Sequence, residues 1–174
     1  MQRLVVVFLL VVSAGAGCAG GSDTGAPGDP YGLSELEMPA TDAEILVALE
    51  RLPRQISGVP QRQGPDDVPA VLYGDRSSIS AIPFPLERSA GESIAEDLAQ
   101  FENEAGAVVD RRHLDPASDL VWLTGSFTDQ SGGIVHLAVW GEPNGDWAFN
   151  VSAESPDLRD AIARAFAEAL RAGD

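Results

Sequence analysis

The chain has 174 residues, with 27 acidic and 11 basic side chains and a formal net charge of −16 at pH 7. This excess of negative charge repels nucleic-acid phosphates and anionic lipid head groups, so we expect no nucleic-acid partner. A single cysteine excludes an intramolecular disulfide, and the folded part therefore depends on core packing.

The first seventeen residues have the order of a secretory signal. Arg3 supplies a positive charge, an unbroken apolar run follows over residues 4–12, and only small residues fill 13–17. The run is too short to cross a hydrocarbon core of ~30 Å. We therefore interpret residues 1–17 as a signal peptide that is removed on export.

Cys18 lies directly after this signal, preceded by the small residues Ala16 and Gly17. The junction resembles the lipobox of bacterial lipoproteins, although Gly15 stands where that class usually has an aliphatic residue. The resemblance implies that diacylglycerol is attached to the Cys18 thiol and that a dedicated signal peptidase then cuts before Cys18. It also implies a protein anchored in the cell membrane or outer membrane, with its domain on the periplasmic or extracellular side.

A second cleavage pattern competes with this interpretation. Ala14, Gly15 and Ala16 form an A-x-A site for ordinary signal peptidase, which would release a soluble protein. An unpaired thiol on a secreted protein is exposed to oxidation and cross-linking, which favours lipidation. Two acyl chains, each contributing ~0.8 kcal/mol per buried CH₂, give the stable anchoring that one chain does not.

Residues 18–40 are predicted to join the lipidated cysteine to the domain. Glycine, proline, serine and aspartate dominate positions 19–32, and this composition cannot bury enough apolar surface to become ordered. The segment is therefore predicted to be a flexible tether. One globular domain is expected over residues 41–174.

Three helices are predicted in this domain, at 41–53, 89–106 and 155–173. Each begins with a Ser or Thr able to cap the N-terminus, and the first two carry Glu three residues later, which completes a capping box. Each also places large apolar residues three or four positions apart, as an amphipathic helix requires. In the second helix this apolar stripe consists of Ile94, Leu98 and Phe101.

Strand patterns fill the remainder of the domain. Shorter candidates lie at 69–75, 77–84 and 107–112, and three strong ones lie at 119–128, 132–142 and 145–154. The order of elements predicts an α+β fold, an antiparallel sheet of about five to six strands with about three helices on one face.

The last two strands are predicted to form a hairpin through the turn Glu142 to Asp146, with three residues in its loop. This turn would set Val139 opposite Phe149 and Leu137 opposite Val151. The apolar face so formed, with Val121, Leu123 and Phe127 from the preceding strand, is expected to pack on the helices.

The other face of these strands is where we predict a ligand site. It would carry Trp122, Thr124, His136, Ala138, Trp140, Asn150 and Ser152. Trp122, His136 and Trp140 are the candidate binding residues, because aromatic side chains with a polar handle are favoured at interfaces. The alternative is that a helix or loop covers them as part of the core.

No pattern of catalytic residues stands out, and no cofactor or metal is expected. His113 and Asp115 are the nearest approach to a metal pair, but two ligands at that spacing occur often by chance. We predict a non-enzymatic lipoprotein held in the bilayer by acylated Cys18, with a domain that binds an envelope protein or a small ligand. The alternatives are an envelope hydrolase using carboxylates and a histidine, and an accessory subunit of an envelope complex.

Overall fold

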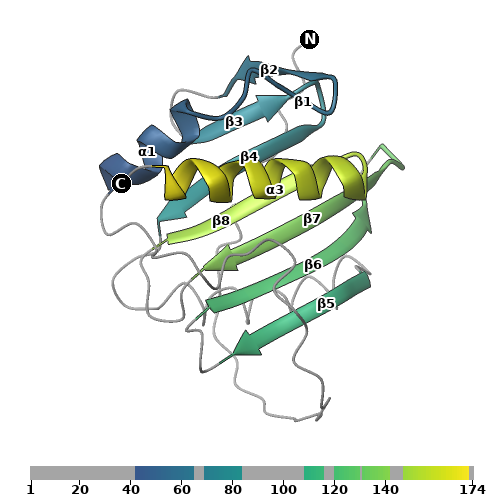
Figure 1. Cartoon of the computed structure of the whole chain (residues 1–174). Coiled ribbons are helices and arrows are strands. Elements are labelled where there is room, and N and C mark those ends of the chain that lie inside the picture. The colour runs from purple at the N-terminus through teal and green to yellow at the C-terminus, as the bar shows by residue number, and fades with distance from the viewer. Residues whose placement is uncertain are drawn as a thin grey trace.

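The structure is a computed structural model that describes residues 42–64, 69–83, 108–115, 120–129, 131–141 and 147–172. They form an α+β fold in which two helices lie on one face of an antiparallel sheet (Figure 1). The elements are α1 (Asp42–Glu50), β1 (Gln55–Ile56), β2 (Val59–Gln63), β3 (Ala70–Tyr73), β4 (Ser77–Pro83), β5 (Val108–Asp115), β6 (Leu120–Thr128), β7 (Ile134–Gly141), β8 (Trp147–Ala153) and α3 (Pro156–Arg171).

The described strands follow the order β1-β2-β3-β4-β8-β7-β6-β5, and each neighbouring pair is antiparallel. The sequence predicted five to six strands, and β1 and β2 are the ones it missed. β1 has only two residues, and β2 contains Pro60 and no alternation of apolar and polar residues. The two strands are joined by Ser57 and Gly58, whose φ angles of 50° and 83° suit the tight turn of a two-residue hairpin.

The helices α1 and α3 correspond to the first and third helices predicted from the sequence. Ser155 caps α3 as expected, because its side chain accepts a hydrogen bond from the Leu158 backbone N–H at 3.3 Å. Pro156 follows at the first helical position, where its missing N–H costs nothing. The second predicted helix, over 89–106, lies outside the described residues, so two helices are described where about three were predicted.

The main core lies between the sheet and the two helices. Trp140, Phe149 and Phe166 form its centre, with ring centroids 5.1 to 6.1 Å apart. At the α1 end, the Tyr73 hydroxyl donates to the Pro53 carbonyl at 2.8 Å, and burial raises the pKa of Tyr73 to about 12. We call the side of the sheet that carries this core the helix face, and the opposite side the second face.

The register of β7 and β8 differs by one residue from the sequence prediction. Trp140 lies opposite Phe149 and Ala138 opposite Val151, whereas Val139 lies opposite Asn150. A shift of one residue moves a whole strand to the other face. The residues of β6 and β7 that were expected to pack on the helices, such as Leu123 and Val139, therefore lie on the second face.

The observed register is incompatible with the predicted turn. The last described pair is Gly141 with Ala148, so the strands do not close on the three-residue loop that the proline and glycine indicated. The observed register places the large rings of β7 and β8 together under α3. Packing of these aromatic side chains in the core thus outweighs the local preference of the turn residues.

Candidate functional site

Trp140 is part of the core. Its side chain is 0% exposed, and its ring packs against Phe149 and against Phe166 of α3. For this residue the structure matches the alternative stated above, in which a helix covers the predicted site. A residue so placed stabilises the fold and is closed to a ligand unless α3 moves.

Trp122 and His136 share the helix face with Trp140. In the β6–β7 register Trp122 is paired with Trp140 and Ser126 with His136, so all four positions lie on the helix face. The side chain of His136 is partly exposed, as is that of Ser126. Of Trp122 the structure describes only the backbone.

The helix face is apolar under α3 and becomes more polar on the strands that α3 does not cover. α3 packs on β4, β8 and β7, while β6 and β5 extend beyond it (Figure 1). Below α3 the face carries Ala138, Trp140, Phe149 and Val151. On β6 it continues with Thr124 and Ser126.

The register adds two further positions, both on β5, to this part of the face. His113 of β5 pairs with Trp122, and Arg111 pairs with Thr124, after an irregularity in β5 that follows Val109. We call the set Arg111, His113, Trp122, Thr124, Ser126 and His136 the polar strip. The polar strip contains Trp122 and His136, two of the three predicted site residues, but not Trp140. Its other members are hydroxyl-bearing and basic residues of β5 and β6.

The two histidines of the chain are not neighbours in this strip. His113 of β5 lies opposite Trp122 of β6, whereas His136 of β7 lies opposite Ser126 of β6. The two histidines therefore lie on either side of β6, and their partners on β6 are four residues apart. At a rise of ~3.3 Å per residue, the two histidines are offset by about 13 Å along the strand direction, which is too far for a shared metal ion. Within the parts of the chain that the structure describes, no three His, Cys, Asp or Glu side chains gather at one point.

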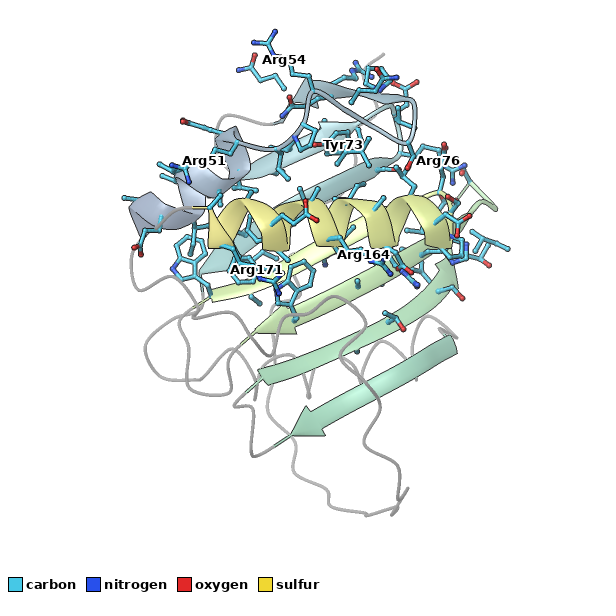
Figure 2. All side chains as sticks on the ribbon, viewed as in Figure 1. Arg51, Arg54, Tyr73, Arg76, Arg164 and Arg171 are labelled. Carbon is cyan, nitrogen blue, oxygen red and sulfur yellow. The ribbon has the colours of Figure 1, made fainter. Side chains whose placement is uncertain are left out.

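A second polar cluster lies at the turn between β6 and β7. The Asp129 carboxylate accepts hydrogen bonds from the Ser131 hydroxyl at 2.6 Å, the Ser131 N–H at 2.8 Å and the Gly133 N–H at 2.9 Å. Arg76, which immediately precedes β4 and is labelled in Figure 2, donates to the same carboxylate at 2.7 Å. These bonds, that from the Ser131 hydroxyl first, lower the pKa of Asp129 to about 2.

This cluster is a structural element of the turn. A carboxylate that accepts several hydrogen bonds and stays ionised to such low pH is a poor proton acceptor at neutral pH. Gly133 fits the same role, because a Cβ at this position would clash with the Arg76 guanidinium. The pattern Asp-x-Ser-Gly-Gly over 129–133 is a turn signal that the sequence analysis passed over.

The chain matches no protein-family model, and no match to it was found among curated proteins or among solved structures. Cys18, the predicted lipidation site, lies outside the described residues. Of the described helices, neither combines the length and the apolar character that crossing a membrane requires.

Proposed function

We propose that the protein is an envelope lipoprotein, anchored through diacylglycerol on Cys18, whose domain binds a ligand or an envelope protein at the polar strip. The anchor is supported by the position of the only cysteine, directly after a signal sequence and a run of small residues. The tether over 18–40 follows, and a flexible chain of that length has a root-mean-square reach of roughly 25 Å. The domain can thus contact partners some distance from the lipid surface.

The observation that carries the binding role is the change in the helix face beyond α3. A sheet face that served only as core would remain apolar across the strands, as it does from Phe149 to Trp140. Instead Thr124, Ser126 and His136 continue it, and Ser126 and His136 are partly exposed. Hydroxyl and imidazole groups of this kind fix the orientation of a bound molecule.

The charge of the chain limits the chemistry of that molecule. At a net charge of −16 the domain repels polyanions over long range, so a neutral or cationic ligand or protein surface is favoured. We therefore place small polar ligands and protein partners, rather than nucleic acids, in the class of molecules bound.

The anchor is tested by the intact mass of the protein purified from its own cells in detergent. A mature chain that begins at Cys18 and carries the added mass of diacylglycerol supports the proposal. A chain that begins at Gly17 without lipid overturns it, because that product results from ordinary signal peptidase. The Cys18→Ser variant is the control, since it removes the acceptor thiol and leaves the signal intact.

Binding at the strip is tested by site-specific photo-cross-linking in intact cells. A photoreactive amino acid replaces Ser126, or replaces Arg164 on the exposed side of α3 as the matched control. Discrete adducts from position 126 and not from position 164 support the strip as the binding surface, and their mass distinguishes a small ligand from a protein. Equal labelling from both positions, or none from 126, contradicts it.

A further inference from the structure

The outer side of α1 carries large apolar side chains that face solvent. On its inner side Ile45, Ala48 and Leu49 are at most 4% exposed and belong to the main core. On its outer side Leu46 and Val47 are 44% and 38% exposed. A surface helix normally places charged or polar residues on the side away from the core. The outer side of α1 is therefore suited to a partner that is itself apolar.

The charges beside Leu46 and Val47 are mixed in sign. Glu44 and Glu50 are exposed acids of α1, whereas the exposed bases Arg51 and Arg54 follow the helix (Figure 2). Because both signs are present, this surface does not single out an anionic partner. The stem of an arginine side chain can also lie along an apolar phase while its guanidinium stays in a polar layer. A bilayer of zwitterionic lipid offers both environments at its interface.

The place of α1 in the chain favours a lipid surface as the partner. α1 is the first described element, and Asp42 at its start is closer in sequence to Cys18 than is any other described residue. If Cys18 carries the anchor, α1 is the described element that enters the domain from the bilayer. A surface held close by a tether has a high effective concentration, so a small apolar contact is enough to engage it.

We propose that the outer side of α1 contacts the bilayer that holds the anchor, with Leu46 and Val47 inserted at the interface of zwitterionic lipid. This inference rests on the proposed function, because the acyl chains on Cys18 bring the domain to the bilayer. The contact also orients the domain. In Figure 1, α1 lies at the left and the turn between β6 and β7 at the right, so this turn, with Asp129 and its partner Arg76, points away from the lipid.

Site-specific photo-cross-linking of the lipoprotein in phosphatidylcholine vesicles tests this contact. A photoreactive amino acid replaces Leu46, or replaces Ile134 at the start of β7 as the matched control, since Ile134 is apolar and 57% exposed. Adducts with the mass of phosphatidylcholine should form several-fold more often from position 46 than from position 134. Equal lipid labelling from the two positions, or none from position 46, would overturn the proposal.

A charge placed in the apolar surface gives a second test in the same vesicles. Val47→Asp should lower lipid labelling from position 46 several-fold, because a carboxylate is costly to bring into an apolar phase. Ile134→Asp should leave this labelling unchanged. Val47 and Ile134 are both exposed, so neither substitution disturbs the core. The same labelling in both variants would contradict a contact made by apolar side chains of α1.

The intact mass of the same preparation separates this inference from the anchor on which it rests. Diacylglycerol on Cys18 together with equal labelling would refute the contact and leave the anchor in place. A chain without diacylglycerol would remove the anchor and the contact together. Cross-links from position 46 to a second copy of the chain, in place of lipid, would assign this side of α1 to a dimer and also overturn the proposal.

Discussion

At the scale of single residues, Asp129 has the most defined environment. Its carboxylate orders the turn between β6 and β7 through Ser131 and Gly133, and ties this turn to the start of β4 through Arg76. The turn is thus fixed by one side chain that accepts bonds from both the backbone and its neighbours. Asx-type turns use aspartate in this way because its oxygens replace backbone acceptors.

We predict that Asp129→Asn lowers stability in a manner that depends on pH. The pKa of Asp129 falls from 3.8 to about 2 in the folded protein, so the folded state favours the ionised carboxylate. The stabilisation is complete above about pH 4 and is lost as the pH falls through about 2. Urea midpoints of the two proteins should therefore differ at pH 7 and converge towards pH 2.

Asp75→Asn is the matched control for this prediction. Asp75 also pairs with an arginine at a turn, but both it and Arg62 are largely exposed to solvent. Exposed pairs of this kind contribute about 0–1 kcal/mol. If the Asp75 and Asp129 variants behaved alike at every pH, the role assigned to Asp129 would be wrong.

At the scale of elements, the register of β7 against β8 has the largest consequence. It places Trp140 of β7 in the core on the helix face, next to Phe149 of β8. We predict that Trp140→Ala costs about 3–5 kcal/mol in the free energy of unfolding, the usual cost of emptying a large aromatic site. Urea unfolding measures this cost, with Ile134→Ala, at an exposed position of β7, as the control.

The result also distinguishes the two interpretations of Trp140. A tryptophan on an open binding face would lose affinity on substitution but would leave stability within about 0.5 kcal/mol, as surface substitutions usually do. A small effect of Trp140→Ala on unfolding would therefore contradict the observed register. A large effect would leave Trp122 and His136 as the predicted site residues on that face.

The elements with local signals could be predicted from the sequence, and those set by long-range packing could not. The cap at Ser155 and the three long strands follow from residue types within a few positions of each other. The register of β8 does not, because it depends on rings that meet only after the chain has folded. β1 and β2 carry too few apolar residues to give a strand pattern at all.

The same distinction between local and long-range signals applies to the candidate site. Alternation along β6 and β7 correctly placed Trp122, His136 and Trp140 on one face. Which part of that face is covered depends on where α3 crosses the sheet. In the chain, β7 and β8 lie between β6 and α3, so this position has no local signal in the sequence of β6. A buried and a ligand-binding tryptophan have the same signal in a strand, so the sequence could not tell that Trp140 belongs to the core.

At the scale of the whole molecule, the cover on the helix face is uneven across the sheet. β8 lies between β4 and β7 and directly under α3, whereas β5 has β6 as its one neighbour in the sheet and lies beyond α3 (Figure 1). Local opening is easiest where fewest groups must separate, and central strands open only with the whole domain. Stability should therefore decline from β8 towards β5.

We predict that amide hydrogen exchange follows this order. Amides of β8 such as those of Phe149 and Val151 should exchange only through global unfolding, with a free energy equal to that from urea unfolding. Amides of β5 that bond to β6 should exchange through local opening, at a lower free energy and with less dependence on urea. Because the polar strip extends onto β5, such opening would let that edge adjust to a bound partner. Protection of β5 equal to that of β8 would instead show a sheet that opens as a single unit, with a strip held rigid from one end to the other.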